Sequence, residues 1–160
     1  MFSILHRRTS PSDLLTSSLF DENTFYKAFA RDLKHCKKEV IIESPYMTVP
    51  RVNSLSPVLR KLVKKGVKVT VNTRFPGHHD KLMRIQAWLA IKELKQVGVK
   101  VRFYNDYLHR KIVIIDSLIL YEGSLNILSQ SKSREIMRRI ESEQLTKQMI
   151  QFLKLKRWYW

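Results

Sequence analysis

Cysteine is almost absent from this chain, because its 160 residues contain a single one, Cys36. One cysteine cannot form a disulfide within a chain, so the class of small disulfide-rich domains is excluded. Cys36 continues the helical spacing of Phe25, Phe29 and Leu33, which predicts that it is a small residue of the core.

Long apolar runs are also absent. No stretch approaches the ~20 residues that a transmembrane helix needs. The first ten residues, MFSILHRRTS, lack an apolar segment of signal-peptide length. We therefore expect a cytoplasmic location. We also find no internal repeat, no low-complexity tract and no Gly/Ser linker.

Acidic residues are scarce. The chain has 14 of them against 30 lysines and arginines, which gives a net charge of +16. A field of this sign and size favours a polyanionic partner, either nucleic acid or an anionic membrane surface. A chain of this length forms one domain with a real core. We expect a basic N-terminal segment over residues 1–20, partly loop, and a single domain over residues 21–160.

Apolar spacing predicts alternating strands and helices. Helices are expected near residues 25–36, 57–65 and 81–96 and from residue 142 onward, and loops near 47–56 and 72–80. A short helix or a loop is expected over 13–19. Strands are expected at 39–43, 67–71, 99–103, 112–115, 118–121 and 135–140. The first three strands are separated by helices, which implies parallel pairing, and the later hairpin makes the sheet mixed.

Two helices have inward faces that the spacing predicts. In the helix near 81–96 the residues predicted to be inward are Leu82, Ile85, Leu89 and Trp88. In the last helix they are Leu145, Met149, Phe152 and Leu153.

The most informative stretch runs from His109 to Asn126. His109 and Lys111 are two apart in extended chain and so point to the same face. The apolar run 112–115 anchors them, and Asp116-Ser117 forms a turn before the return strand. Ser124 and Asn126 then come back toward His109. The four side chains supply a nucleophile or base, a cation and two hydrogen-bond donors, which suits a phosphate ester.

The pattern H-x-K-x4-D-x6-G-S-x-N resembles the signature of the phospholipase D superfamily. The order of elements from about Phe25 to Ile140 resembles its fold, an α/β sandwich with a mixed β-sheet and helices on both faces. In that family two copies of the motif meet in one site, so the single copy here implies a homodimer. The resemblance implies that one His109 attacks phosphorus, forming a phosphohistidine, while the other protonates the leaving oxygen. It also implies that Lys111 and Asn126 bind the phosphate, that Ser124 assists, and that no metal or cofactor is needed.

Two acids accompany the motif. We interpret Asp116 as a turn or supporting residue at the far end of the apolar strand, rather than as the catalytic acid. Family members commonly place an acid after the G-S-x-N segment to orient the histidine, and Glu135 is the candidate. The alternative for Glu135 is a surface ion pair.

Further residues are candidates for substrate binding. Arg74 and His78 follow a predicted parallel strand, near the edge where α/β sheets bind ligands, although a solvated loop would look the same. Arg134 lies next to Glu135. Lys64 and Lys65 belong to a basic helical stretch that could contact phosphates or simply be solvated. The run His78-His79-Asp80 has no complementary ligand cluster, so no metal site is expected. The terminal Trp158, Tyr159 and Trp160 could stack on bases or pack against the protein.

These observations favour a metal-independent nuclease that acts on DNA, and RNA stays open as the alternative nucleic acid. The net charge of the chain favours a nuclease over a membrane-surface phospholipase or phosphatidyltransferase that acts on anionic lipid. A non-catalytic nucleic-acid-binding module is the third alternative. The run Gly123 to Arg139 resembles phospholipase D-like domains found with helicases, which implies a helicase-associated assembly.

Overall fold

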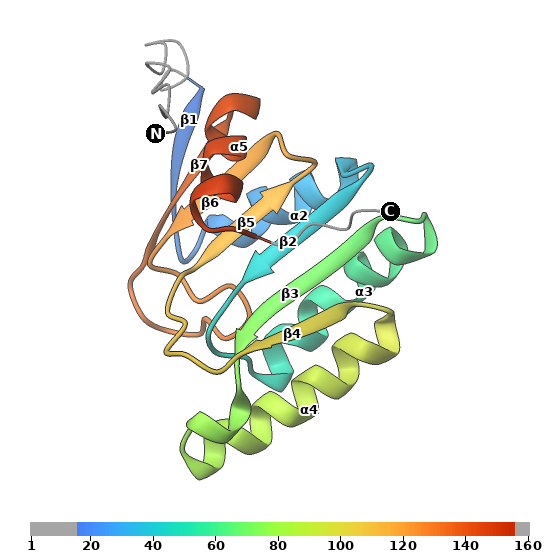
Figure 1. Ribbon diagram of the computed structural model, residues 1–160, viewed down its shortest axis with the longest axis vertical. Coiled ribbons are helices and arrows are strands. Elements are labelled where there is room, and N and C mark those ends of the chain that lie inside the picture. Colours follow the sequence, from blue (N-terminus) through green and yellow to red (C-terminus); the bar gives the residue numbers. More distant parts are fainter. Residues whose placement is uncertain (1–15, 156–160) are drawn as a thin grey trace, which may run out of the picture.

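The computed structural model describes residues 16–155, which form a seven-stranded mixed sheet in the order β1-β7-β6-β5-β2-β3-β4 (Figure 1). The N-terminal residues before 16 and the aromatic tail Trp158, Tyr159 and Trp160 lie outside this range. The α/β class and the mixed sheet predicted from the sequence are confirmed.

One half of the sheet is parallel. β2 (Glu39–Glu43), β3 (Lys68–Arg74) and β4 (Lys100–Tyr104) are joined by the helices α3 (Val49–Lys64) and α4 (Lys81–Val97). A single 3-10 turn, η1 (Pro76–His78), precedes α4. Gly98 ends α4 with a φ of 95°, a left-handed conformation that glycine adopts without strain.

The other half is antiparallel. β5 (Ile112–Ile115) and β6 (Ile119–Gly123) form the expected hairpin, and β5 pairs with β2 at the centre of the sheet. β7 (Ile136–Glu141) follows, and β1 (Ser17–Asp21) forms the outer edge. The N-terminal boundary expected after residue 20 therefore falls inside a strand, and residues 17–19 are neither helix nor loop. Strand pairing with β7 fixes them, and a local pattern cannot reveal such a long-range partner.

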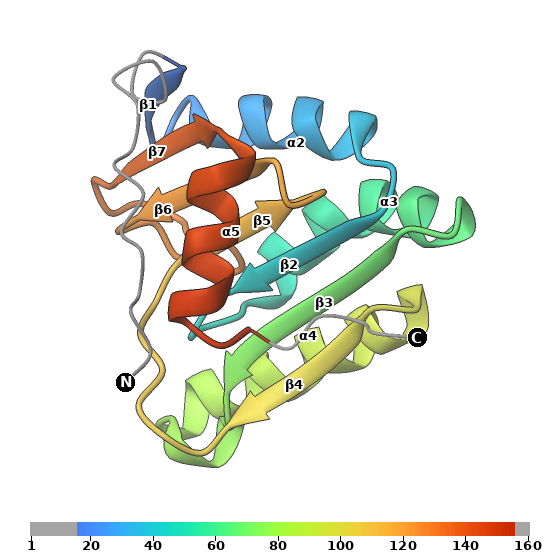
Figure 2. The same ribbon diagram turned by 45° about the horizontal axis from the view of Figure 1, so that its top comes forward.

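Helices cover both faces of the sheet, as predicted (Figures 1 and 2). The larger core lies between the sheet and α2 (Phe25–His35), α3 and α4, and it includes Cys36. A smaller core lies under α5 (Glu143–Phe152) on the opposite face. Alternation along β2 serves both cores, because Val40 and Ile42 enter the first while Ile41 enters the second.

The expected loop over 47–56 is wrong, because α3 already begins at Val49 and contains Pro57 in its interior. A proline inside a helix removes a hydrogen bond and costs about 3 kcal/mol. Val52, Leu55, Leu59 and Leu62 are all buried along one face of α3, and this packing runs straight through the proline. Tertiary burial therefore outweighs the local breaker signal.

The predicted inward face of α4 is also wrong. Leu82, Ile85, Trp88 and Leu89 are exposed. The buried residues of the helix are instead Ala87, Ala90, Ile91, Leu94 and Val97. The two alanines allow close approach to the sheet and to α3. Near the end of α4 the approach is close enough that a Cβ on Gly98 would lie 2.7 Å from Val63 Cγ1.

In α5 the predicted inward residues divide. Leu145, Met149 and Leu153 are partly buried and pack against the smaller core. Phe152 is 82% exposed and does not. Across residues 16–155, no helix has the length and apolar character needed to cross a membrane.

Candidate functional site

One edge of the sheet, at which its parallel strands end, carries four polar residues of the motif: His109, Lys111, Ser124 and Asn126. β2, β3 and β4 are parallel and end at this edge, β5 begins there, and β6 ends there (Figure 2). The connections leaving these strands carry His109 and Lys111 before β5, and Ser124 and Asn126 after β6. The sheet topology thus brings both halves of the motif to the edge where parallel strands usually present ligand sites.

His109 and Lys111 form the centre of the site. His109 is exposed, while Lys111 is 7% exposed. Lys111 Nζ lies 2.7 Å from His109 Nδ1, 3.3 Å from Nε2 and 2.5 Å from the His109 carbonyl oxygen. Burial lowers the pKa of Lys111, and the carboxylate of Glu135 partly opposes this effect. Because Lys111 Nζ lies so close to the His109 ring, a phosphate group that contacts the imidazole is also within reach of the Lys111 ammonium group.

Ser124 and Glu135 are joined by a hydrogen bond in which the Ser124 hydroxyl donates to Glu135 Oε2. The Ser133 hydroxyl donates to Oε1 at 2.8 Å, and the Ile136 amide donates to Ser124 Oγ at 3.1 Å. Gly123 permits this arrangement, because a Cβ there would lie 2.1 Å from the Ile136 carbonyl oxygen. Within the chain, Glu135 thus supports Ser124 and acts on Lys111 through its charge. Its role in orienting a histidine stays a prediction.

Asn126 begins a turn, and its carbonyl oxygen accepts from the amides of Ser129 and Gln130 at 3.1 and 2.8 Å. These bonds fix the backbone that carries the side chain. Asn126 Oδ1 is buried and has no hydrogen-bond partner among residues 16–155. An unsatisfied buried polar atom is costly, and the hydrogen bonds among residues 16–155 leave this acceptor unused.

Three residues that sequence reasoning missed lie around His109. Arg110 forms an ion pair with Glu43, at 2.6 Å from Nε to Oε2, and Glu43 is fully buried at the end of β2. The Tyr46 ring lies edge-on to the imidazole of His109 at 6.4 Å. The one signal in the sequence was Glu43 itself, an acid ending the apolar strand EVIIE, where a buried charge needs a partner.

Arg74 and His78 reach the same edge, as expected, from the end of β3 and from η1. Arg74 NH2 donates to the His78 carbonyl oxygen at 3.1 Å. The guanidinium also lies over the ring of Tyr107, 4.8 Å from its centroid, and Tyr107 was not singled out from the sequence. Arg134 is exposed in the connection between β6 and β7, next to Glu135.

Lys64 and Lys65 do not reach the site. They end α3 just before β3 begins, at the edge of the sheet opposite His109. Asp116 also lies at that opposite edge. Its carboxylate accepts from the amides of Lys37, Lys38 and Glu39 at 2.7 to 3.0 Å, which supports its interpretation as a turn and supporting residue.

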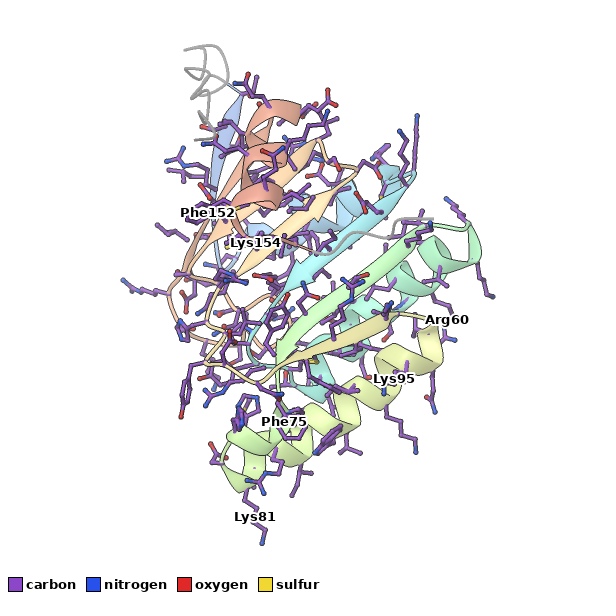
Figure 3. The ribbon with its side chains drawn as sticks, viewed as in Figure 1. Arg60, Phe75, Lys81, Lys95, Phe152 and Lys154 are labelled. Atoms are coloured by element: carbon purple, nitrogen blue, oxygen red, sulfur yellow. The ribbon has the colours of Figure 1, made fainter. Side chains whose placement is uncertain are left out.

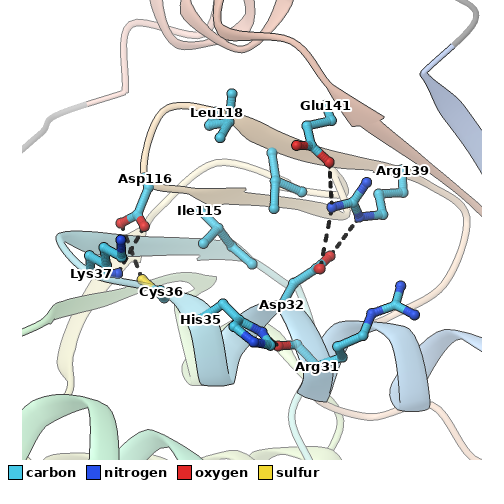
Figure 4. A pocket seen from close by; sticks show the side chains of 11 residues that line it. Arg31, Asp32, His35, Cys36, Lys37, Ile115, Asp116, Leu118, Arg139 and Glu141 are labelled. Atoms are coloured by element: carbon cyan, nitrogen blue, oxygen red, sulfur yellow. Dashed lines mark hydrogen bonds and ion pairs between the residues drawn. The ribbon is translucent and has the colours of Figure 1, made fainter.

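A pocket of about 380 Å³ lies beside Asp116. Figure 4 shows its second wall, where Arg139 pairs with Asp32 and Glu141. These ion pairs satisfy the charged groups of that wall, while Arg31, His35 and Lys37 also line the pocket. The pocket therefore lies at the edge of the sheet opposite His109, away from Lys111, Ser124 and Asn126.

The run from His78 to Asp80 has a structural role. Asp80 caps α4 by accepting from the Met83 amide at 3.0 Å. His79 is buried against Tyr46, and its pKa is lowered by burial and by the charge of Arg74. Within residues 16–155, no group of three or more His, Cys, Asp or Glu side chains could hold a metal ion.

Comparison with known proteins places the chain in a family. Residues 29–157 match the family described as cardiolipin synthase, PLD-like domain. The chain belongs to this phospholipase D-like family, and its class is that of a phospholipase D-superfamily phosphodiesterase domain.

Individual relatives agree with this assignment. Cardiolipin synthase A of Buchnera aphidicola subsp. Acyrthosiphon pisum (strain Tuc7) is 28% identical over 110 residues, which are 68% of this chain. The match spans only 22% of that relative's length. Among solved structures, Nuc from Salmonella typhimurium, a phospholipase D family member, superposes with a TM-score of 0.70 at 18% identity, covering 86% of this chain and 92% of the other. NucT from Helicobacter pylori gives a TM-score of 0.69 at 17% identity, with the same coverage.

Proposed function

We propose that this protein is a metal-independent phosphodiesterase that cleaves DNA or RNA through a phosphohistidine, at a site shared by two protomers of a homodimer. The observation that carries this proposal is the exposed His109 with the Lys111 ammonium 2.7 Å from its ring. Each chain contributes one such pair. The reaction needs a second imidazole, because a ring that attacks phosphorus must be unprotonated while one that donates to the leaving oxygen must be protonated.

In the first step a ring nitrogen of one His109 forms a bond to phosphorus, and the bond from phosphorus to the leaving oxygen breaks. The partner's His109 gives that oxygen its proton. In the second step the same partner residue takes a proton from water, whose oxygen displaces the first histidine from phosphorus. Lys111 and Asn126 hold the non-bridging oxygens through both steps, assisted by Ser124. These groups offset negative charge where it develops, as phosphoryl transfer requires.

Nucleic acid is the proposed substrate because positive charge dominates the whole chain and because basic residues lie in the segments that form the site. Exposed Lys132 and Arg134 lie in the connection that carries Ser124, and Arg74 lies at the end of β3. Contacts to several phosphates release counterions, so affinity should fall steeply as salt rises. A flat salt response would contradict a groove that follows the phosphate backbone.

The decisive assay offers single- and double-stranded DNA, RNA and cardiolipin-containing vesicles to the purified protein in excess EDTA. The proposal expects nucleic-acid cleavage that persists in the chelator and disappears in His109→Ala. Phe152→Ala is the matched control, since it removes an exposed side chain from α5 (Figure 3). Binding without cleavage, unchanged by His109→Ala, would instead support a non-catalytic binding module.

The shared site can be tested by mixing chains. Wild-type and His109→Ala protein are unfolded together and refolded at varying ratios, so that mixed dimers form. If each site uses both histidines, activity should fall as the square of the wild-type fraction. A linear fall, or an active monomer in light scattering, would overturn the shared site.

A second candidate is a phosphatidyltransferase or phospholipase acting on anionic lipid. It is favoured by the family description and by the relatives named cardiolipin synthase A. The same assay separates the two candidates, because lipid turnover without nucleic-acid cleavage would replace the first with the second.

A further inference from the structure

The Tyr107 side chain lies near the site, and its exposure to solvent needs an explanation. It lies two residues before His109 in the connection between β4 and β5, and it is 83% exposed. Exposing a large aromatic ring to water forgoes most of the stabilisation that its burial would give. The ring nevertheless has defined neighbours.

Those neighbours come from two other segments that end at the same edge of the sheet. The Arg74 guanidinium carbon lies 4.8 Å from the centroid of the Tyr107 ring, within the range of a cation–π contact. The His78 ring lies 6.3 Å away and is tilted by 31°. Arg74 is itself held by its bond to the His78 carbonyl oxygen. Its Nε is buried without a hydrogen-bond partner among residues 16–155, so the guanidinium keeps an unused donor.

Further aromatic rings lie behind this cluster. Phe75 makes edge-on contacts with His78 at 5.6 Å, with Phe103 at 5.9 Å and with Trp88 at 6.1 Å. Figure 3 shows Phe75 near the end of the molecule where α4 begins. The exposed ring of Tyr107 thus continues a packed aromatic group and carries a cation on it.

We propose that Tyr107, with Arg74 and His78 behind it, is a stacking platform for an unpaired base beside the scissile phosphate, so that the site prefers single-stranded nucleic acid. This inference rests on the proposed nuclease function and names its substrate class. In a duplex both faces of each base are covered by neighbouring bases, so a protein ring cannot stack on them. In a single strand the faces are free, and stacking on an aromatic ring tolerates any base.

The arrangement also explains the adjacent cation. A base seated on Tyr107 brings its own phosphate close to the chain, where the positive charge of the Arg74 guanidinium attracts it. Aromatic faces combined with a positive groove are the usual means of holding single strands without reading their sequence. The platform therefore predicts strand preference without base specificity.

The test compares Tyr107→Ala, Tyr107→Trp and the control Phe152→Ala, whose side chain is equally exposed, at 82%, on another element. Each change is placed in a His109→Ala background, and binding is measured with a fluorescent single strand and with the matching duplex. Tyr107→Ala should weaken single-strand binding by about tenfold and leave duplex binding unchanged. Tyr107→Trp should retain it, and Phe152→Ala should have no effect.

A direct signature of stacking is the quenching of 2-aminopurine placed at successive positions along the strand. Quenching at one position, lost in Tyr107→Ala, supports the platform. Equal loss of single-strand and duplex binding, or loss of the dimer in light scattering, would overturn it. If otherwise wild-type protein cleaves nucleic acid and Tyr107→Ala keeps the same ratio of single- to double-strand cleavage, only the platform fails. If wild-type protein cleaves no nucleic acid, the proposed function fails instead.

Discussion

Arg110 holds the segment between the two basic residues of the motif through an ion pair with Glu43, at 2.6 Å from Nε to Oε2 and 3.2 Å from NH2 to Oε1. Side chains alternate along an extended chain, so Arg110 points away from the face shared by His109 and Lys111. Asn72 also donates to Glu43, at 3.3 Å. Glu43 on β2 and Asn72 on β3 therefore fix Arg110, the residue between His109 and Lys111.

Glu43→Gln should reduce kcat by about tenfold with a smaller change in KM. The variant keeps the size of the side chain but loses the charge that orients Arg110, and a displacement of ~1 Å at a reacting group can cost up to ~100-fold in rate. The steady-state constants should be measured together with thermal unfolding. Glu93→Gln is the control, because Glu93 forms a surface pair with Arg60 at 3.7 Å. An unchanged kcat would contradict the positioning role.

Glu135 should set the alkaline limit of activity through Lys111. Burial lowers the pKa of Lys111, and the Glu135 carboxylate raises it. If the ammonium form binds phosphate, activity is lost as pH rises through this pKa. Glu135→Gln removes the raising charge, so the alkaline limb of the pH–rate profile should move to lower pH.

The matched control for this shift is Glu122→Gln on β6, a carboxylate that does not contribute to the lowered pKa of Lys111. Its profile should overlay that of the wild type. If the alkaline limb of the Glu135→Gln profile stays at the wild-type pH, even with a lower rate, then Glu135 does not act on the pKa of Lys111. That outcome would leave Glu135 with only its hydrogen bonds from Ser124 and Ser133.

The motif and most of the sheet could be predicted because their signals are local. His109 and Lys111 adjoin an apolar strand, Gly98 ends a helix, and alternating valines mark β3. Arg110 and Glu43 are 67 residues apart in sequence, so their pairing depends on the antiparallel contact of β2 with β5. Tyr107 carried no periodic signal, because a loop has none.

Misleading local signals explain the errors. Pro57 reads as a helix start, yet the buried face of α3 extends on both sides of it. In α4 two apolar stripes compete, and the bulkier one is exposed. Which stripe faces inward depends on how closely α4 approaches α3 and the sheet. That distance cannot be predicted from hydrophobicity alone.

The choice of stripe can be tested by comparing Leu94→Ala with Leu82→Ala. Leu94 is fully buried, so its truncation leaves a cavity and should cost about 2–5 kcal/mol of unfolding free energy. Leu82 is 76% exposed, and its truncation should cost less than about 0.5 kcal/mol. Urea unfolding of both variants measures the difference. Equal losses would mean that α4 is rotated from its position here.

Asp116 should contribute stability that depends on pH. Burial raises the pKa of this carboxyl, but hydrogen bonds from the amides of Lys37, Glu39 and Lys38 outweigh burial and leave the pKa below its usual value. A lowered pKa in the folded state stabilises the protein above the unfolded pKa, and this stability is lost as pH falls through the folded value.

Asp116→Asn tolerates the residue's φ of 54° but loses the charge, so it should lower the unfolding free energy by about 2 kcal/mol at neutral pH. The gap between variant and wild type should shrink below about pH 4. Denaturant unfolding at several pH values measures this gap, with Asp106→Asn at an exposed residue as the control. A gap that is independent of pH would show that the hydrogen bonds from the three amides do not need the charge of Asp116.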